Sequence, residues 1–301
     1  MFLSIGEVLW DLLPSGAKPG GAPVNFAYHA QVLGAKAAFV SAVGTDSLGD
    51  DLLAFFRTIG LSVELVQRIN GSPTGTVGVE LGPDGQPKFT IHENTAWDRI
   101  VCTPEALDYV RKSDVVCFGS LASRSDTTRN TVQTLLDHCR DETLKVLDLN
   151  LRPPFVEKRI LENLLSRANV LKLNDEEITV LADMFGCPSA EMIGQTKWFL
   201  ERYAFRFLIL TRGAKGSVLL KNTLEIAEHP GFALAPAEIG DTVGAGDGFT
   251  AAAILGYLAG WPLDKINETA NAYAAFICTQ VGATPEIPER FRLLNFTRPR
   301  Q

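Results

Sequence analysis

The sequence predicts an α/β protein built on a doubly wound, mostly parallel β-sheet flanked by helices. Two observations predict this fold class. Apolar, β-rich runs alternate along the chain with helical segments, which is the order expected when crossover helices join parallel strands. The helical segments also have readable ends, because some close on glycine and others open on a capping residue or a proline. A length of 301 residues suits one domain of this kind, spanning residues 1–301.

Five apolar runs are the candidate strands of the main sheet, in chain order Ala37–Val43, Asp114–Gly119, Lys145–Leu149, Asn169–Leu173 and Phe205–Leu210. Four helices are marked by their ends: Pro23–Leu33 before Gly34, Leu48–Ile59 before Gly60, one that opens at Thr103-Pro104-Glu105 and one that opens at Ser125-Asp126. Sheets of this class bind ligands at the carboxyl ends of their strands. Polar residues that follow the apolar runs are therefore the candidates for a functional site.

One segment departs from the alternation of strands and helices. Thr76–Leu81 and Lys88–Glu93 both alternate with period two, and Gly82-Pro83-Asp84-Gly85 between them is a strong turn signal. We expect an antiparallel hairpin outside the main sheet, within about residues 74–98. The hairpin is either an edge decoration or a lid over the site, and the alternation alone favours neither. The residues from Pro285 onward are expected to form a surface tail.

Composition restricts the kinds of partner. The net charge is -7 and the pI is about 5.2, so a nucleic-acid-binding face is not expected. A nucleotide or a sugar phosphate is compatible with this charge, because backbone amides bind phosphate without many cationic side chains. No apolar run approaches the length of a membrane span, and we expect no membrane partner.

The cysteines and the first residues indicate a cytoplasmic protein. The five cysteines are odd in number and none is arranged as CxxC, which favours free thiols in a reducing compartment. Met1–Pro14 has no basic leader and carries Glu7 and Asp11 within its apolar stretch, so it is not a signal peptide.

The sharpest motif is Asp241-Thr242-Val243-Gly244-Ala245-Gly246-Asp247, which is followed by the apolar helical segment Gly248–Leu258. The small residues Gly244, Ala245 and Gly246 place backbone amides at a helix N-terminus, where unpaired N–H groups and the helix dipole favour an anion. Asp247 then lies in the first turn, and we expect the dipole to help keep it ionised. A carboxylate there could accept the proton of an attacking hydroxyl, although a lone aspartate before a helix usually serves only as a cap.

Two strings make the chain recognisable as a whole. Asp241–Asp247 resembles the C-terminal signature of the ribokinase-like (PfkB) carbohydrate kinases, and Gly20-Gly21-Ala22-Pro23-Val24-Asn25-Phe26-Ala27 resembles their N-terminal signature. The resemblance implies an α/β sandwich with a small β lid, ATP as phosphoryl donor, Mg²⁺ and often a monovalent cation such as K⁺. It also implies that Asp247 is the catalytic base and that the amides of Gly244 to Asp247 form an anion hole.

The acceptor side is predicted from the N-terminal third. Gly20 and Gly21 form a tight turn before a helix and Asn25 lies one turn in, so amides and an amide side chain could bind hydroxyls, although Gly-Gly before a helix is usually only a turn. The resemblance implies that Asp11, Gly21 and Asn25 contact the acceptor. Gly6-Glu7 through Trp10-Asp11 together with Gly-Gly-Ala-Pro is most similar to fructokinases, so fructose is the expected sugar.

The stretch Ile91–Asp98 departs from the fructokinase pattern. Typical fructokinases carry an arginine a few residues before an Ala-Asp pair, whereas this stretch has no arginine and a tryptophan between Ala96 and Asp98. His92 and Asn94 are expected to share a face of the second hairpin strand and to meet the sugar, although a histidine at a strand edge is more often solvated. No HxxH or HExxH spacing supports a histidine-bound metal.

The donor side follows later strands. Asn174 and Glu177 form a capping box and also match the N-x-x-E motif that, by the resemblance, organises hydrated Mg²⁺ and phosphate, and we expect both roles at once. Arg152, in Asp148-Leu149-Asn150-Leu151-Arg152, suits a phosphate or a sugar acid and is assigned to the acceptor side. By resemblance the remaining positions are Thr211, Arg212, Gly213 and Gly216 in the nucleotide loop, Asn271 near the adenine, and Asp241, Val243 and Gly282 around a monovalent cation.

Several alternatives stay open. Within the same chemistry the acceptor could be 2-keto-3-deoxygluconate, ribose or a nucleoside. A catalytically inactive relative that serves as a binding or regulatory protein would be expected to lose the base or the glycine loop, which this chain keeps. A P-loop kinase lacks support because GxxxxGK[ST] is absent, and a dinucleotide-dependent oxidoreductase would need G-x-G-x-x-G after the first strand. Lid hairpins of the family often pair across a homodimer, and the sequence does not decide this.

Overall fold

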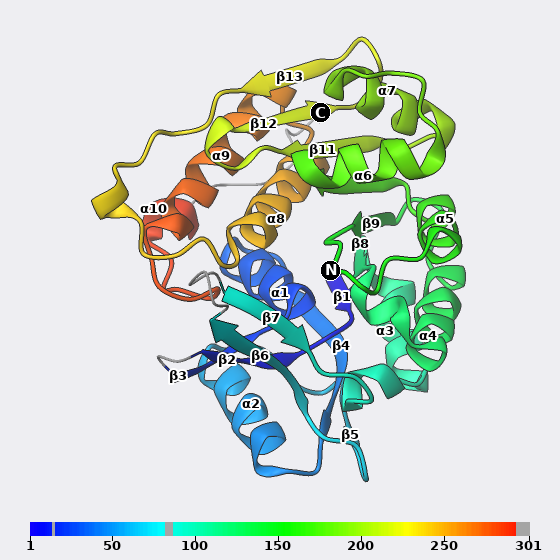
Figure 1. Ribbon diagram of the computed structural model, residues 1–301, viewed down its shortest axis with the longest axis vertical. Helices are drawn as coiled ribbons and strands as arrows, with labels where there is room; N and C mark the ends of the chain where they lie inside the picture. The colour runs from blue at the N-terminus through cyan, green and yellow to red at the C-terminus, as the bar shows by residue number, and fades with distance from the viewer. Residues whose placement is uncertain (14–15, 82–86, 293–301) are drawn as a thin grey trace.

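A computed structural model describes residues 1–13, 16–81 and 87–292, and its centre is a nine-stranded sheet (Figure 1). The strands of this main sheet, in spatial order, are β13 (Ile226–His229), β12 (Ser217–Leu220), β11 (Phe207–Thr211), β10 (Val170–Asn174), β9 (Leu144–Asp148), β8 (Val115–Gly119), β1 (Phe2–Ile5), β4 (Ala37–Gly44) and β5 (Val66–Ile69). Neighbouring strands from β11 to β5 are parallel, and β12 and β13 add an antiparallel edge.

Helices cover both faces of the main sheet. The α-helices are α1 (Ala22–Val32), α2 (Ser47–Thr58), α3 (Pro104–Lys112), α4 (Asp126–Asp137), α5 (Lys158–Arg167), α6 (Asp175–Phe185), α7 (Met192–Arg202), α8 (Ala245–Leu258), α9 (Leu263–Cys278) and α10 (Glu289–Arg292). Short 3₁₀ turns are η1 (Ala96–Arg99), η2 (Leu121–Arg124), η3 (Gly213–Lys215) and η4 (Pro236–Glu238).

Two apolar cores, one on each face, explain the layers. Successive side chains of a strand point to opposite faces, so in β4 Phe39 and Val43 join one core while Val40 and Ala42 join the other. The first core contains α1, α2, α8 and α9, and the second contains α3 to α7. The doubly wound, mostly parallel sheet predicted from the sequence is therefore confirmed.

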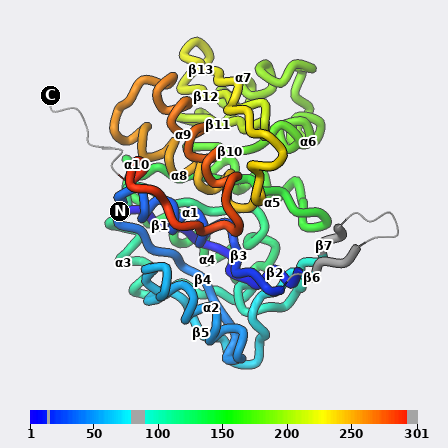
Figure 2. Tube along the Cα trace, turned by 90° about the vertical axis from the view of Figure 1, so that its left-hand side faces the viewer, coloured from blue at the N-terminus to red at the C-terminus, as the bar shows by residue number. Residues whose placement is uncertain are grey.

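A second, smaller sheet lies beside the main one. Its order is β3 (Gly16–Gly20), β2 (Leu9–Leu13), β6 (Gly75–Leu81) and β7 (Pro87–Ile91), and we call it the small sheet. The β6–β7 pair is the predicted antiparallel hairpin, and its predicted turn at Gly82–Gly85 falls outside the described residues. Figure 2 shows β2, β6 and β7 projecting at the side of the main layers. The sequence analysis missed β2 and β3, so the hairpin is only half of this sheet.

The predicted strands and helices of the main sheet lie within two residues of the observed ones. The prediction of a surface tail from Pro285 onward was wrong for the residues that the structure describes. Ile287 and Phe291 are buried in the first core, and the hydroxyl of Tyr28 donates a 2.6 Å hydrogen bond to the carbonyl of Pro285. Apolar burial outweighs the polar composition of this segment.

Across the described ranges, no helix is long and apolar enough to cross a membrane. The five cysteines are free thiols, as expected.

Candidate active site

Polar side chains from five elements meet at the carboxyl edge of the main sheet. Glu7 follows β1, Asp148 ends β9 and Lys172 lies in β10. Asn25 comes from the first half of α1, and Asp247 comes from the first turn of α8. Since α1 packs against α8, residues from the two ends of the chain become neighbours. This is the edge at which sheets of this class bind ligands.

The N-terminus of α8 forms an open cradle of backbone amides. The N-cap residue, Gly244, has φ 78° and no side chain caps this end of the helix. A Cβ atom on Gly244 would lie 2.7 Å from the carbonyl oxygen of Ala283, so only glycine fits in this conformation. First-turn amides at the positive end of the helix dipole favour an anion. The geometry of Gly244, Ala245 and Gly246 therefore suits a phosphate.

Asp247 is held by a residue of the acceptor-side motif. The Nδ2 atom of Asn25 donates a 2.8 Å hydrogen bond to Oδ2 of Asp247. Asn25 is buried, and its Oδ1 atom has no hydrogen-bond partner among the described residues. A buried acceptor without a partner is costly, and a hydroxyl placed next to Asp247 could donate to it.

Asp247 titrates near neutral pH. Burial raises the pKa of its carboxyl group to about 7, and the negative charge of Asp148 adds to the effect. The positive charge of Lys172 and the hydrogen bond from Asn25 lower the pKa without cancelling the rise. The expectation that the helix dipole keeps Asp247 ionised thus underestimated burial, which is the largest cause. A pKa close to the working pH is what a general base needs.

Lys172 brings one positive charge into this cluster of carboxyl groups. Its Nζ atom lies 2.9 Å from Oδ1 of Asp148, and both side chains are buried. Burial lowers the pKa of Lys172, but the carboxylates of Asp148 and Glu177 raise it more, so the ammonium group stays charged. A Cβ on Gly246 would lie 3.3 Å from Nζ, so the charge lies directly beside the amide cradle.

Glu7 is a second carboxyl group without full compensation. Burial raises its pKa to about 7, against the influence of its own backbone amide and of Arg152. Its Oε2 atom has no partner among the described residues. Glu7 therefore carries a proton more readily than an exposed glutamate does.

The acceptor-side residues flank this cluster. Asp11 lies on β2 opposite Lys18 of β3, and a Cβ on Gly20 would lie 2.7 Å from Oδ2 of Asp11. Burial raises the pKa of Asp11, whereas the charges of Arg152 and Lys18 lower it. Gly21 has φ 126°, and a Cβ there would lie 2.4 Å from the carbonyl oxygen of Glu7. The carboxyl group of Asp11 thus lies close to Gly20 and to the charge of Arg152, which is exposed.

The placement of His92 and Asn94 on one strand face was wrong. Strand β7 ends at Ile91, so both residues lie in the segment that leaves the small sheet, and both are exposed. Asn94 has φ 57°, which no strand residue adopts. Nδ1 of His92 lies 2.5 Å from the hydroxyl of Thr76 on β6.

On the donor side the capping box is confirmed. The side chain of Asn174 accepts hydrogen bonds from the amides of Glu176 and Glu177. The carboxylate of Glu177 accepts 2.8 Å hydrogen bonds from the amides of Asn174 and Leu151. Within the described ranges no group of three His, Cys, Asp or Glu side chains could hold a metal ion. One carboxylate still fits Mg²⁺, which keeps several waters and binds substrate phosphates. Both carboxylate oxygens of Glu177 are engaged by backbone amides and the side chain is buried, so a hydrated ion could contact this residue only through water.

The predicted nucleotide loop joins β11 to β12. Thr211 ends β11, Gly213 begins η3, and the amide of Arg212 donates a 2.7 Å hydrogen bond to the carbonyl of Gly216. The guanidinium of Arg212 bonds Glu228 at 2.6 Å, so this side chain braces the turn. Gly213 to Lys215 of this loop are exposed, whereas Gly216 is buried.

Asn271, expected near the adenine, is buried in α9. Its Nδ2 atom donates to Ser217 at 2.7 Å and to the carbonyl of Asn267 at 2.8 Å. The side chain of Asn271 therefore links α9 to Ser217, the first residue of β12, next to the predicted nucleotide loop.

The three residues expected around a monovalent cation do lie together. Oδ1 of Asp241 accepts a hydrogen bond from the amide of Val243 at 3.0 Å, and Oδ2 accepts from the amide of Gly282 at 2.8 Å. Lys18 of the small sheet lies 3.3 Å from Oδ2. Both carboxylate oxygens are thus engaged, and a cation in this loop would have to be held by carbonyl groups.

Comparison with known proteins identifies the family of this chain. Residues 16–290 match the pfkB family carbohydrate kinases. The chain belongs to this family. It is 28% identical over 320 residues to a sugar kinase from Pyrococcus horikoshii named as putative, covering 100% of this chain and 97% of that protein. It is 29% identical over 315 residues to a probable fructokinase of Arabidopsis thaliana, covering 96% and 94%.

Solved structures of other proteins have the same fold. The Pyrococcus horikoshii sugar kinase in complex with ATP matches with a TM-score of 0.79 at 27% identity, over 94% of each chain. An Escherichia coli chain described as a candidate ribokinase matches with a TM-score of 0.81 at 20% identity, over 96% of this chain and 98% of the other. The fold of this pfkB kinase is therefore ribokinase-like.

Sequence reasoning missed part of the charge cluster of this pfkB kinase. Glu7 and Asp148 lie within predicted motifs, but no role was predicted for either residue. No role was predicted for Lys172. A signal existed for Lys172, because a charged residue within an otherwise apolar buried strand usually has a buried partner. That the partner is Asp148 depends on the pairing of β9 with β10.

Proposed function

We propose that this carbohydrate kinase transfers the γ-phosphoryl group of ATP to a sugar hydroxyl, with Asp247 as the base and fructose as the acceptor. One observation carries the proposal above the others. A buried carboxyl group with a pKa near 7 lies in the first turn of an uncapped helix and accepts a hydrogen bond from Asn25. The base, an acceptor-side amide and a phosphate cradle thus occupy one place.

The residues support a direct transfer. The sugar hydroxyl donates to Asp247, and Oδ1 of Asn25 is free to accept a hydrogen bond from the sugar. As the hydroxyl oxygen attacks the γ-phosphorus, its proton passes to the carboxylate of Asp247 and the bond from the γ-phosphorus to the bridging oxygen of ADP breaks. The amides of Gly244 to Asp247 and the charge of Lys172 stabilise the negative charge on the transferred group.

Other residues have supporting roles in the proposal. Mg²⁺, when bound, neutralises charge on the triphosphate, and Glu177 would hold it through water. The backbone of Thr211 to Gly216 would lie against the nucleotide, with Asn174 nearer the phosphates. K⁺ would bind through carbonyls of the Asp241–Val243 loop and Gly282.

Fructose is favoured by the N-terminal string and by the named fructokinase among the relatives. Arg152, beside Glu7 and Asp11, would also suit a sugar acid such as 2-keto-3-deoxygluconate, which is the second candidate acceptor. His92 and Asn94 lie at the exit of the small sheet and would contact the sugar only if this sheet closes.

An acceptor panel tests the proposal. The protein with ATP and Mg²⁺ is assayed by coupled detection of ADP with fructose, 2-keto-3-deoxygluconate, ribose and a nucleoside. We expect fructose to have the highest kcat/KM. A higher value for another sugar would replace fructose and keep the kinase activity, whereas no ADP release with any of the acceptors would point to the inactive binding protein.

The small sheet is proposed to act as a lid and to pair with a second copy in a homodimer. Protection of β6 from hydrogen exchange by the sugar would support the lid, and light scattering would measure the mass. No protection by the sugar would return the sheet to an edge decoration, and a monomer would exclude the homodimer.

A further inference from the structure

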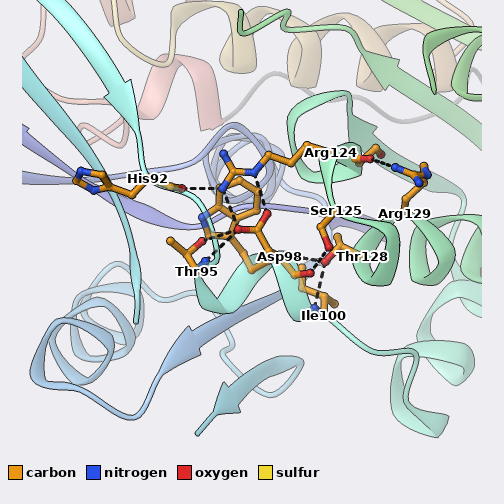
Figure 3. A network of polar contacts seen from close by, with 10 residues as sticks. His92, Thr95, Asp98, Ile100, Arg124, Ser125, Thr128 and Arg129 are labelled. Atoms are coloured by element: carbon orange, nitrogen blue, oxygen red, sulfur yellow. Dashed lines mark hydrogen bonds and ion pairs between the residues drawn. The ribbon is translucent and has the colours of Figure 1, made fainter. Parts of the chain in front are cut away.

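The segment that leaves the small sheet, His92–Asp98, is held by an arginine from another element. Figure 3 shows the guanidinium group of Arg124, at the end of η2, reaching Asp98 and the backbone of His92. Nε and Nη2 each lie 2.8 Å from a carboxylate oxygen of Asp98, and Nη2 donates a 2.6 Å hydrogen bond to the carbonyl of His92. The two side chains are only 7% and 9% exposed, so the ion pair is shielded from solvent.

Two aromatic rings fix the plane of the same guanidinium group. The Cζ atom of Arg124 lies 4.0 Å from the ring centre of Trp97 and 4.5 Å from that of Phe155. Phe155 belongs to the loop that carries Arg152, since the amide of Phe155 donates a 2.9 Å hydrogen bond to the carbonyl of Arg152. Arg124 therefore joins the exit of the small sheet to the Arg152 loop.

The guanidinium group that binds the segment His92–Asp98 comes from η2 and not from the segment itself. The stretch Ile91–Asp98 has no arginine of its own and carries Trp97 instead, which the structure uses as one of the stacking surfaces. Asp98 and Thr95 complete the segment, because Oδ2 of Asp98 accepts a 3.0 Å hydrogen bond from the amide of Thr95. The segment therefore offers Arg124 a carboxylate, a backbone carbonyl and an aromatic ring, all of which bind a guanidinium group.

The contacts of Arg124 lie on the acceptor side of the reaction centre. The positive charges of Arg124 and Arg152 both lower the pKa of Glu7, so both arginines lie close to that carboxyl group. The nucleotide loop belongs to β11 and β12, whereas Arg124 follows β8, three strands away from β11. A cleft of about 490 Å³, lined by Asn94, Arg99, Arg124, Phe155 and Glu157 among others, opens beside the stack.

We infer that Arg124 is a positioning residue for the acceptor, which holds the exit of the small sheet and the Arg152 loop in one fixed relation. The inference rests on the proposed kinase function and names a residue that sets its acceptor affinity. It requires that loss of the fork and the stack weakens acceptor binding and leaves ATP binding intact.

The test compares Arg124→Lys, Arg124→Met and Phe155→Leu with the wild-type protein. Lysine keeps the charge without the planar fork, and Phe155→Leu removes one stacking surface while the ion pair remains. Arg129→Met is the matched control, since among the described residues Arg129 bonds Asp126 and the carbonyl of Ser123 in η2 but neither Asp98 nor the backbone of His92. Thermal unfolding is measured for each variant, so that lost stability is separated from lost affinity.

We expect KM for the acceptor to rise about 10- to 100-fold in both Arg124 variants and less in Phe155→Leu, while KM for ATP changes less than about twofold. Hydrogen exchange without substrates should accelerate in 91–98 and 75–81 and stay unchanged in α8. Arg129→Met should match the wild type. Equal changes in both KM values, or faster exchange throughout the chain, would overturn the inference.

The exchange measurement does not depend on turnover. If no sugar is phosphorylated by the wild type, the proposed function fails, while local loosening of 91–98 in the variants would still establish that Arg124 holds this segment. An unchanged exchange rate there would refute the inference even if the kinase activity is demonstrated.

Discussion

The side-chain amide of Asn25 donates a 2.8 Å hydrogen bond to the carboxylate of Asp247, although 222 positions separate them in the sequence. The bond joins the first half of α1 to the first turn of α8. Because it lowers the pKa of Asp247, it favours the ionised form that a base requires. The motifs Gly20–Ala27 and Asp241–Asp247 are therefore linked by one hydrogen bond.

Removing this bond should impair catalysis more than stability. For Asn25→Ala we expect kcat/KM for the acceptor to fall about 10- to 100-fold, the kinetic equivalent of one hydrogen bond to a charged group. Ser4→Ala is the control, since the hydroxyl of Ser4 bonds the carbonyl of Pro23 at the same end of α1 without touching Asp247. Steady-state kinetics and thermal unfolding of both variants check this, and equal activity of the two would argue against the role of Asn25.

The pH dependence follows from the raised pKa of Asp247. Because burial raises this pKa to about 7, the carboxyl group becomes protonated as the pH falls through 7, and kcat should fall with it. Lys172→Met removes a charge that lowers the pKa, so the acid limb should move to higher pH. Asp148→Asn removes a charge that raises it, so the limb should move to lower pH.

The groups that face Asp247 are Asn25, Glu7, Asp148 and Lys172. The pH dependence of kcat is measured from about pH 5 to about pH 9, a range centred on the pKa of about 7. The midpoint of the acid limb gives the pKa of the base in each variant. Acid limbs that coincide in the wild type and both variants would contradict an electrostatic role for the Asp148–Lys172 pair.

Gly244 should be the least replaceable residue of the amide cradle. In Gly244→Ala the alanine would have to adopt a φ of 78°, and its Cβ would lie 2.7 Å from a backbone oxygen. We therefore expect the free energy of unfolding to fall by about 2–3 kcal/mol and ATP binding to weaken. Gly260→Ala is the control, because its φ of 72° imposes a similar strain while nothing lies within 4 Å of the added Cβ. Calorimetric titration with ATP should show weakened binding for Gly244→Ala alone. Similar ATP affinities for the two variants would argue against close approach of phosphate to Gly244.

Local patterns predicted most of the main sheet. The run Asp114–Gly119 is apolar from Val115 to Phe118 because both faces of the parallel sheet are covered there, and β8 lies within one residue of that run. The same patterns did not reveal β2, since only Gly6 to Val8 separate it from β1 and one apolar stretch covers both strands. A change of sheet between two such strands leaves no local signal.

The site was predictable where small residues mark a helix start. Asp247 and Asn25 each lie just after glycines that a close backbone approach requires, and their meeting follows from the packing of α1 on α8. The Arg124–Asp98 pair was not predictable, because it depends on how the exit of the small sheet folds over η2. Such long-range contacts are set by tertiary packing and not by spacing along the chain.

The most direct measurement is the turnover of Asp247→Asn. Asparagine keeps the size of the side chain but cannot take up the hydroxyl proton, so kcat should fall roughly 10²- to 10⁴-fold. ATP affinity by calorimetry and KM for the acceptor should change little. Asp264→Asn, in the first turn of α9 and exposed, is the matched control and should be fully active. A folded Asp247→Asn protein with near wild-type kcat would contradict the assignment of the base.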